Sequence, residues 1–483
     1  MGRSFTTAEI VMSRLTGVLL LCSFAGSPAF SQGAPRDERP ARMREYLAAA
    51  ASLGHLNGSV LVAERGKVLI DTAYGFANME LGVRNTPETR FRVASITKQF
   101  TAMAVMMLAE EGKLSIADPI SKWVDSVPLS WRALTVHQLL RHTSGISDYE
   151  EWFDGYTTQA YSDYMSQAHA PLRIMRDAMR KPLDHDPGTK FHYSNSAYIV
   201  LGFIIERASG MPYDEFLRRR ILEPLGMTRS DQDRSERLVA DRAQGYRFRQ
   251  GGYPAAFFNG LSRADHYNAF YQLMEPPQAD AGLVTTARDL YKWDQALYGE
   301  RLMKQAALDS VFSPGIGGYG YGWFVATGVD GRTHEHSGGL PGFSAYIMRI
   351  PETRRSVIVL NNIERSGSIE RDLAAILRGA PVAMPRARRI VANDTARDVA
   401  RAGTYRSTSG DSVRVFVEAG RIGVHQPGRF RVGLLSEGPD QYFSPQLGGE
   451  VRFTEAAGRI TITVRDALGT PLIVAERRAA AWP

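Results

Sequence analysis

The chain is poor in two residue types, cysteine and lysine, and both shortages limit what it can do. Among its 483 residues the only cysteine is Cys22. That residue lies in an expected N-terminal leader. If the leader is removed after residue 31, the mature chain has no thiol, which excludes disulfides, thiolate metal sites and a cysteine nucleophile together. Lysine occurs only eight times, so arginine supplies most of the positive charge behind the net +7. No nucleic-acid-binding motif accompanies this charge, and we therefore expect no nucleic-acid partner.

The leader itself is too short to cross a membrane. An apolar run at 15–25 follows Arg14 and precedes small residues with a cleavage site at 29–31. This order is typical of an export signal, whereas a membrane span needs about 20 apolar residues. We predict a signal peptide over residues 1–31, a periplasmic or secreted protein, and no stable membrane span after signal removal. A lipid anchor at Cys22 is the less favoured alternative, because the residue before it is a leucine where a small side chain is expected.

Strand-like segments occur near both ends of the region 41–378, with helices and loops between them. These segments lie at 59–63, 67–71, 321–325, 333–337, 344–350 and 356–360. Arg65-Gly66 between the first two favours a hairpin. Strands at both ends of a helical region indicate one antiparallel sheet that the chain leaves and rejoins, which is an α+β architecture.

The stretch Ser-Ile-Thr-Lys at 95–98 opens a helical pattern that ends near Gly112. In a helix Ser95 and Lys98 share one face, which brings an amine to a hydroxyl. A serine hydroxyl is a weak nucleophile, and an amine desolvated by apolar neighbours can take its proton. Backbone N–H groups at a helix N-terminus favour the oxyanion formed when Ser95 attacks a carbonyl. On its own the pattern also fits an N-capping serine with a surface lysine.

A second candidate stretch, Tyr193-Ser194-Asn195, can bring a phenol and an amide into one cavity from a loop. A phenol of pKa about 10 is a feeble base, but a neighbouring ammonium such as Lys98 favours the phenolate and lowers that pKa. Asn195 can hold Lys98 through its oxygen and a substrate amide through its nitrogen. Without Ser95 the same stretch is typical of a turn with a packed tyrosine.

The third stretch is His336-Ser337-Gly338-Gly339 on an expected strand, where alternation places His336 and Gly338 on one face. Gly338 lets a substrate backbone lie along the strand edge, and His336 can donate a hydrogen bond or a charge to it. Together with His334 this histidine can also chelate zinc, yet further ligands at typical spacing are missing. We therefore expect neither a metal nor another cofactor here.

These three stretches, in this order, resemble the active-site motifs of the serine β-lactamase and penicillin-binding-protein superfamily. The likeness is closest to class C β-lactamases, D-alanyl-D-alanine carboxypeptidases and D-aminopeptidases. Further stretches similar to family signatures lie at 141–145, 281–286 and 318–323. The resemblance covers roughly residues 41–377 and implies a β-lactamase-like antiparallel sheet flanked by helices, an all-helical region, and acyl-enzyme chemistry.

By this resemblance Ser95 is the acylated nucleophile, Lys98 assists its deprotonation, and Tyr193 carries protons to the leaving group and activates the deacylating water. Asn195 and the strand at 336–339 would orient the substrate. The oxyanion hole would consist of the backbone N–H groups of the nucleophile and of the last glycine in the third stretch. Which of Lys98 and Tyr193 is the base stays open, because such groups titrate as a coupled pair.

One departure from β-lactamases bears on the substrate. Those enzymes usually carry lysine at the position of His336, whereas histidine is only partly charged near neutral pH. We therefore rank hydrolysis of amide or peptide bonds in D-amino-acid substrates first, ester hydrolysis second and β-lactam hydrolysis third. The expected partner is a small-molecule or peptide substrate. A non-catalytic penicillin-binding sensor or scaffold is a further alternative, which the presence of all three catalytic residue types opposes.

The remaining parts of the chain carry less specific patterns. An aromatic-rich stretch at 245–278 either walls the substrate pocket or is an ordinary packed excursion. Prolines and arginines at 379–395 are typical of a linker. Short alternating strands with glycine turns then predict an all-β sandwich or barrel over 396–483, which looks like the lipocalin-like C-terminal domain of some of these hydrolases. Whether it covers the active site or mediates assembly stays open, and so does the oligomeric state.

Overall fold

The computed structural model describes residues 37–478, except 154–158, 168–169, 249–265, 329–330, 365–368, 388–389, 409, 419, 427–429, 445–448 and 466–470. The expected leader at 1–31 lies outside these residues. Within them the strands form one six-stranded sheet, one nine-stranded sheet and three small sheets. The small sheets contain β3 (Phe76–Asn78) with β4 (Val83–Arg84), β5 (Phe91–Arg92) with β6 (Asp231–Gln232) and β9 (Leu283–Thr285), and β7 (Tyr246–Phe248) with β8 (His266–Asn268).

Strands that are far apart in the sequence pair at the centre of the six-stranded sheet. Its order is β10-β11-β12-β13-β1-β2, with antiparallel neighbours throughout. Gly58 pairs with Asn361 and Glu64 with Arg355, which places β1 beside β13. The strands are β1 (Gly58–Glu64), β2 (Lys67–Tyr74), β10 (Phe324–Gly328), β11 (Gly331–Leu340), β12 (Phe343–Ile350) and β13 (Arg355–Asn361). The α+β class and the antiparallel sheet that the chain leaves and rejoins are confirmed.

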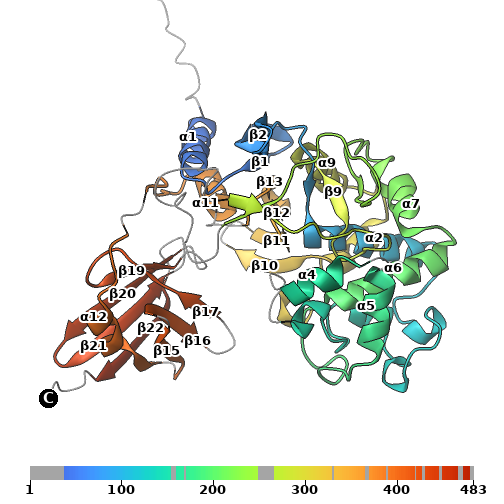
Figure 1. Cartoon of the computed structure of the whole chain (residues 1–483). Helices are drawn as coiled ribbons and strands as arrows, with labels where there is room; N and C mark the ends of the chain where they lie inside the picture. The colour runs from blue at the N-terminus through green and yellow to red at the C-terminus, as the bar shows by residue number, and fades with distance from the viewer. Residues whose placement is uncertain are drawn as a thin grey trace, which may run out of the picture. The chain divides into compact units, whose positions relative to one another are not determined.

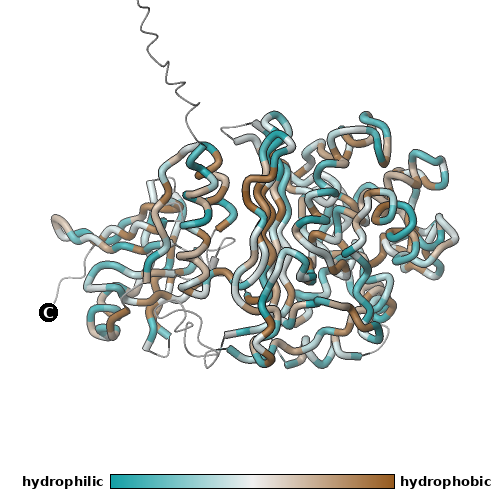
Figure 2. Tube along the Cα trace, turned by 90° about the horizontal axis from the view of Figure 1, so that it is seen from above, coloured by the Kyte–Doolittle hydropathy of each residue, from teal (hydrophilic) through white to brown (hydrophobic). Residues whose placement is uncertain are grey.

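Helices cover both faces of this sheet (Figure 1). On one face α1 (Arg39–Ser52) and α11 (Ile369–Leu377) pack on Val60 and Val62, together with alternate residues of the neighbouring strands. Leu61 lies between these valines and joins the larger core on the other face. Strands buried on both faces are apolar along their length, and Figure 2 shows the middle of this sheet as hydrophobic.

Two long helices, α2 (Thr97–Glu110) and α6 (Asn195–Ser209), pack against each other in the larger core. Every residue of α2 from Thr97 to Leu108 is buried, as expected for a helix enclosed by protein on all sides. Ser194 caps α6 by accepting a hydrogen bond from the backbone of Ala197 (3.1 Å). Both helices therefore begin inside the core, at the residues of the first two candidate stretches.

The other helices are shorter. They are α3 (Val136–Leu140), α4 (Gln159–Met165), α5 (Ala170–Met179), α7 (Tyr213–Leu217), α9 (Ala287–Ala296), α10 (Gln305–Val311) and α12 (Thr395–Arg401). In the part of the chain that the structure describes, no helix combines the length and the apolar character needed to cross a bilayer.

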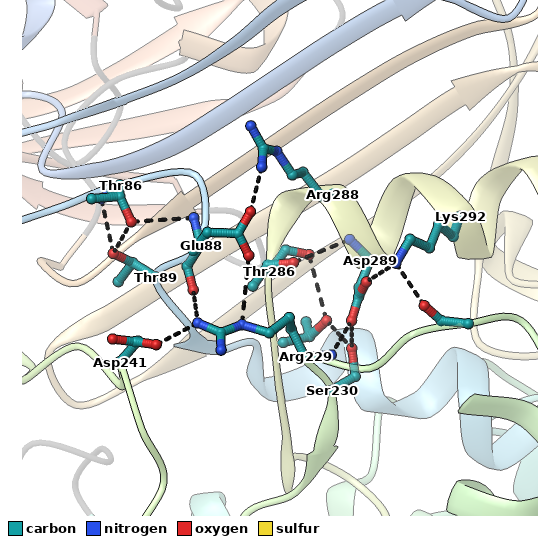
Figure 3. A network of polar contacts seen from close by, with 12 residues as sticks. Thr86, Glu88, Thr89, Arg229, Ser230, Asp241, Thr286, Arg288, Asp289 and Lys292 are labelled. Atoms are coloured by element: carbon teal, nitrogen blue, oxygen red, sulfur yellow. Dashed lines mark hydrogen bonds and ion pairs between the residues drawn. The ribbon is translucent and has the colours of Figure 1, made fainter. Parts of the chain in front are cut away.

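A polar network fixes the N-terminal end of α9 (Figure 3). The side chain of Thr286 caps this helix by accepting from the backbone of Asp289 (3.1 Å). Asp289 in turn accepts from the hydroxyl of Ser230 (2.9 Å) and from the backbone of Arg229 (2.8 Å). Arg229 also pairs with Asp241. Three chain segments are thus joined around the start of one helix.

The nine-stranded sheet belongs to the last part of the chain and nearly closes on itself. Its order is β17-β16-β15-β14-β22-β21-β20-β19-β18, and only Leu434 separates the two end strands in the sequence. Tyr405, Tyr442 and Phe453 belong to a separate apolar core of this sheet, so side chains fill its interior. The all-β character expected for this part is confirmed. The strands are β14 (Gly403–Ser407), β15 (Ser412–Glu418), β16 (Arg421–Gln426), β17 (Phe430–Gly433), β18 (Leu435–Ser436), β19 (Gln441–Ser444), β20 (Gly449–Ala456), β21 (Arg459–Arg465) and β22 (Pro471–Arg478).

Candidate active site

Ser95 lies at a sharp turn, where β5 gives way to the 3-10 turn η1 (Ala94–Ile96) and then to α2. Ala94 takes a left-handed conformation with φ of 48°. Such strain costs about 1–3 kcal/mol and is common at functional sites. Ser95 is half-buried, and its Oγ lies 3.0 Å from Nζ of Lys98 in the first turn of α2. The contact predicted from the spacing is present, and the alternative of a surface lysine is wrong because Lys98 is buried.

The amine of Lys98 has a partner for each of its three N–H groups. It donates to Ser95 Oγ (3.0 Å), to Asn195 Oδ1 (2.7 Å) and to the backbone carbonyl of Asp280 (3.0 Å). It also lies 4.9 Å from the ring centre of Tyr193. None of these partners is a carboxylate, and among the described residues no carboxylate forms an ion pair with Lys98.

Burial makes this amine easier to deprotonate. Desolvation lowers the pKa of Lys98 to about 8, although the charges of Asp280, Glu150 and Asp148 act in the opposite direction. Near that pH much of the amine is neutral, and a neutral amine has a lone pair that can accept the proton of Ser95.

Tyr193 lies between Ser95 and a buried histidine. The side chain of Ser95 lies near enough to the Tyr193 hydroxyl to lower its pKa, and the tyrosine ring stacks on His142 with 4.2 Å between the ring centres. Burial raises the pKa of Tyr193 well above its ordinary value, and the contact with Ser95 offsets this only in part. The expectation of a lowered pKa for this phenol is wrong, because loss of water on burial dominates its surroundings. Tyr193 is therefore a neutral hydroxyl in the resting site.

Asn195 is the first residue of α6 rather than a loop residue. Its Oδ1 accepts from Lys98 (2.7 Å), as predicted. Its Nδ2 donates one of its two N–H groups to Oδ2 of Asp148 (3.1 Å), so at most one is left for the substrate amide that was expected there. With 4% of its surface exposed, Asn195 acts mainly as a buried link between Lys98 and Asp148.

Three acidic side chains that sequence reasoning missed lie around the Lys98 amine. Asp280 is fully buried and accepts from the hydroxyl of Tyr149 (2.9 Å). Burial raises the pKa of Asp148 to about 6. Burial and the charge of Asp148 raise the pKa of Glu150 to about 8. The neighbourhood of Lys98 therefore holds more acidic groups than basic ones.

The sequence contained a signal for two of these acids. Asp148 lies three residues after the family-like stretch 141–145, and Asp280 directly precedes the family-like stretch 281–286. His142, which stacks on Tyr193, lies inside the first of these stretches. The flanks of the two stretches were therefore the place to look, although only the fold brings them to Lys98.

Strand β11 leaves part of its edge open beyond the point where β10 ends. Pairing with β10 reaches only to Glu335, whereas pairing with β12 continues to Leu340. Ser337 and Gly339 lie beyond Glu335 and are exposed. Among the described strands none covers this edge, so a substrate backbone can pair with it as an added strand.

Gly338 brings this strand into contact with the turn that holds Ser95. A Cβ atom at Gly338 would lie 2.1 Å from the carbonyl oxygen of Val93 and 3.1 Å from the backbone nitrogen of Ser95. Both distances are below ordinary contact, so only glycine lets β11 pass so close to η1. The third candidate stretch is therefore adjacent to Ser95, as predicted.

His336 shares the buried face of β11 with Gly338, as the alternation predicted, and is 2% exposed. Its Nδ1 is 2.6 Å from the carbonyl oxygen of Ser337, and its Nε2 is 3.0 Å from the hydroxyl of Tyr319. Nδ1 therefore donates, and Nε2 accepts from the tyrosine. Desolvation, followed by the charge of Lys98, lowers the pKa of His336 to about 3. The expected partial charge near neutral pH is wrong, because the ring is buried and neutral.

One group of potential metal ligands occurs in the described part of the chain, namely Glu151, Asp184 and His192. Glu151 lies 3.3 Å from Nε2 of His192, and Asp184 lies 3.3 Å from Nδ1 of the same ring. The two carboxylates therefore face different nitrogens of the same ring. His334 and His336, the pair considered for zinc, do not belong to this group.

The aromatic stretch is described only in part, since residues 249–265 lie outside the described residues. Tyr246 is buried, and its hydroxyl accepts from the backbone of Met79 (2.7 Å). Phe270 packs against the larger core, whereas Tyr271 is 41% exposed. For Tyr246 and Phe270 the interpretation as an ordinary packed excursion fits.

Comparison with known proteins agrees with this geometry. A family model described as beta-lactamase matches residues 41–380. Penicillin-binding protein 4* of Bacillus subtilis is 30% identical over 419 residues, which cover 82% of this chain and 90% of that protein. The octameric penicillin-binding protein homologue from Pyrococcus abyssi gives a TM-score of 0.62 at 25% identity, covering 90% of this chain and 99% of that one. The D-amino acid amidase from Ochrobactrum anthropi shares the fold, with a TM-score of 0.54 at 24% identity over 68% of this chain and 94% of that one.

Proposed function

Because the chain belongs to the beta-lactamase family, within the superfamily that includes penicillin-binding proteins, we propose that it is an exported serine hydrolase with an acyl-enzyme intermediate on Ser95. Its preferred substrates in this proposal are amides or peptides of D-amino acids. The observation that carries the proposal is the buried Lys98 amine, which lies 3.0 Å from Ser95 Oγ without a carboxylate in direct contact among the described residues.

In this mechanism neutral Lys98 is the base that deprotonates Ser95. A neutral amine keeps two N–H groups and one lone pair. The amide oxygen of Asn195 and the backbone carbonyl of Asp280 accept the two N–H groups, which turns the lone pair toward Ser95 Oγ. Tyr193 is the poorer resting base, because its raised pKa keeps it protonated.

Tyr193 then serves as the proton carrier. When Ser95 Oγ attacks the substrate carbonyl and the C–N bond breaks, the leaving nitrogen needs a proton. The neutral phenol of Tyr193 can supply it and recover a proton from the Lys98 ammonium. Water then cleaves the ester on Ser95 by the same groups in reverse. The oxyanion would be held by the backbone N–H groups of Ser95 and Gly339, and removal of one such donor typically costs about 3 kcal/mol.

The charges near Ser95 favour a substrate with a free amine over one with a carboxylate. The carboxyls of Asp148, Glu150 and Asp280 act on Lys98 from close by, and Glu150 is the most accessible of them. An ammonium group of a substrate beside Glu150 would lower its raised pKa of about 8 and favour its carboxylate form. At the position where β-lactamases usually hold a lysine, His336 is neutral and enclosed by protein. A D-amino-acid amide with an ammonium group suits this balance, whereas the carboxylate of a β-lactam does not.

A substrate series tests the preference for a D-amino-acid amide with a free amine. D-Alanine p-nitroanilide, its N-acetyl derivative, the L-isomer, a short-chain p-nitrophenyl ester and nitrocefin are compared at one pH. The D-anilide with the free amine should give the highest kcat/KM, and acetylation should lower it at least about tenfold, because one ion pair with a partly buried carboxylate is lost. Glu150→Gln should shrink the difference between the free and the acetylated anilide.

Covalent labelling tests the chemistry separately from the substrate. A fluorophosphonate should label the wild type, and the label should vanish in Ser95→Ala. A folded wild type that takes no label would support the non-catalytic sensor or scaffold instead. Preferred turnover of the ester or of nitrocefin would contradict the choice of substrate and would leave the nucleophile in place.

Export and the division of the chain belong to the same proposal. We propose a signal peptide at 1–31, a hydrolase domain at 41–378, a linker at 379–395 and a C-terminal domain at 396–483. The order of charged, apolar and small residues in the leader supports export. Mass spectrometry of the protein from periplasmic or culture fractions tests whether the mature chain begins after residue 31.

A further inference from the structure

Asp148 contacts Asn195 twice at the point where α6 begins. Its Oδ1 accepts from the backbone N–H of Asn195 (3.2 Å), and its Oδ2 accepts from the side-chain Nδ2 of the same residue (3.1 Å). The same carboxylate caps the 3-10 turn η4 (Tyr149–Trp152) through the backbone N–H of Glu150. Asp148 is 5% exposed, so water competes poorly for these contacts.

The orientation of the Asn195 amide decides which atom Lys98 meets. An amide has an acceptor oxygen and a donor nitrogen of nearly the same size, so packing does not select between its two orientations. A half-turn of the amide would place Nδ2 instead of Oδ1 at 2.7 Å from the Lys98 amine. A carboxylate only accepts hydrogen bonds, and Asp148 therefore selects the orientation that sends Nδ2 to itself and Oδ1 to Lys98.

This selection affects the proton transfer from Ser95. With Oδ1 toward it, Lys98 uses an N–H group for Asn195 and keeps its lone pair for the serine hydroxyl. In the opposite orientation an N–H group of Asn195 would take the lone pair of the neutral amine. The electron pair that should accept the serine proton would then point away from Ser95.

We propose that Asp148 is a positioning residue, which fixes the amide of Asn195 with its oxygen toward Lys98 and thereby keeps the Lys98 lone pair directed at Ser95. The inference rests on the proposed function, because it takes Lys98 as the base for Ser95. Asp148 acts through Asn195 and takes no part in bond making or breaking.

The first test replaces Asp148 with a side chain of the same shape. Asp148→Asn offers either a donor or an acceptor to Asn195, so the selection is lost. We expect kcat and the rate of Ser95 labelling by a fluorophosphonate to fall about 10- to 100-fold, while KM changes less than about threefold. Glu151→Gln is the matched control, because it removes a carboxylate from the same turn. The Glu151 side chain is 58% exposed and faces His192. This variant should label at the wild-type rate.

The second test exchanges the two side chains. In Asp148→Asn/Asn195→Asp, the carboxylate at 195 can only accept from Lys98, and the amide at 148 can donate to that carboxylate. Because a carboxylate in contact with Lys98 raises its pKa, the rates are compared on the high-pH plateau of each variant, where the amine is neutral. There the double variant should label faster than Asp148→Asn. It should also label faster than Asn195→Asp, in which two carboxylates face each other. A residue that only supports the fold would not be rescued by this exchange.

The outcomes separate the inference from the proposed function. Labelling of Asp148→Asn at the wild-type rate would overturn the inference, and so would a double variant no faster than Asn195→Asp. If circular dichroism shows that Asp148→Asn does not fold, the comparison of the double variant with Asn195→Asp decides alone. Failure of the proposed function gives a different result, since the wild type itself would then take no label.

Discussion

Arg349 and Lys98, two of the buried basic side chains, have opposite kinds of partner. Arg349 is 2% exposed and pairs with the fully buried Asp294 at 2.7 Å. Ser356 adds a hydrogen bond to the same carboxylate (2.5 Å). Lys98 is buried as deeply, yet its three partners are a hydroxyl, an amide and a backbone carbonyl. One charge is thus neutralised by direct contact, and the other is not.

This difference separates stability from reactivity. A carboxylate in contact with Lys98 would favour its ammonium form, whereas uncharged partners let desolvation lower its pKa to about 8. The contact between Arg349 and Asp294 instead joins β12 to α9. A buried base is useful for chemistry when it lacks a direct counter-ion, and useful for the fold when it has one.

Removal of the unpaired amine should give the largest effect. Lys98→Met keeps the length and the apolar stem of the side chain but removes the base, so kcat/KM should fall roughly 10²–10⁴-fold. No buried ion is left without its partner, so the free energy of unfolding should change by no more than about 2 kcal/mol. Steady-state kinetics and urea unfolding on one preparation measure both. Near-normal turnover would contradict the role of Lys98.

Removing the carboxylate that pairs with Arg349 should lower stability and leave turnover unchanged. Asp294→Ala leaves Arg349 buried without its carboxylate, which should lower the free energy of unfolding by about 3–5 kcal/mol. The protein that remains folded should keep its turnover rate. Urea unfolding followed by circular dichroism measures the loss, and Asp294→Ala/Arg349→Met should recover part of it. A large loss of turnover without a loss of stability would contradict the contrast between Arg349 and Lys98.

Local spacing was sufficient to predict the contact between Ser95 and Lys98 but not the electrostatics of the site. Ser95 and Lys98 are three residues apart, so helix geometry alone brings them together. The shift of the Tyr193 pKa has the opposite sign to the prediction, because distant segments such as that of His142 bury the phenol. Desolvation depends on the whole fold, and no local pattern contains it.

The same limit applies to the acids and to the strand edge. The contact of Asn195 with Asp148 spans 47 residues, and that of Lys98 with Asp280 spans 182. Alternation of apolar residues predicted the sheet, yet the open edge of β11 depends on pairing with β10 ending at Glu335. Such features follow from pairing between distant segments, and local patterns in the sequence do not show which segments pair.

The lowered pKa of Lys98 predicts a rate that rises with pH. Below the pKa of about 8 the ammonium form dominates and cannot accept the serine proton. The neutral fraction falls about tenfold for each pH unit below that value, so the labelling rate should rise with pH and level off above about pH 8. Fluorophosphonate labelling between about pH 6 and pH 10 measures this. A profile that is flat across that range would show that the neutral amine is not the base.

A tighter contact between β11 and the turn that holds Ser95 should have a moderate effect. Gly338→Ala forces a methyl group against the carbonyl oxygen of Val93, at a distance of 2.1 Å before any relaxation. Overpacking of this kind costs about 1–3 kcal/mol and should push β11 away from Ser95, so the labelling rate should fall as well. Gly299→Ala is the control, because nothing lies within 4 Å of a Cβ at that position. Equal effects of the two changes would contradict the close approach of β11.

The smallest effect is expected at the exposed ion pairs of the network in Figure 3. Arg288 pairs with Asp71 (2.7 Å) and with Glu88, but its side chain is 45% exposed. Exposed pairs contribute about 1 kcal/mol or less and weaken with salt, so Arg288→Ala should lower the free energy of unfolding by no more than that, and by less at high ionic strength. Urea unfolding at two salt concentrations measures it. A loss as large as that of Asp294→Ala would mean that networks of charge, rather than burial, decide how much an ion pair contributes to the free energy of unfolding. The contrast between Arg349 and Lys98 would then need another cause.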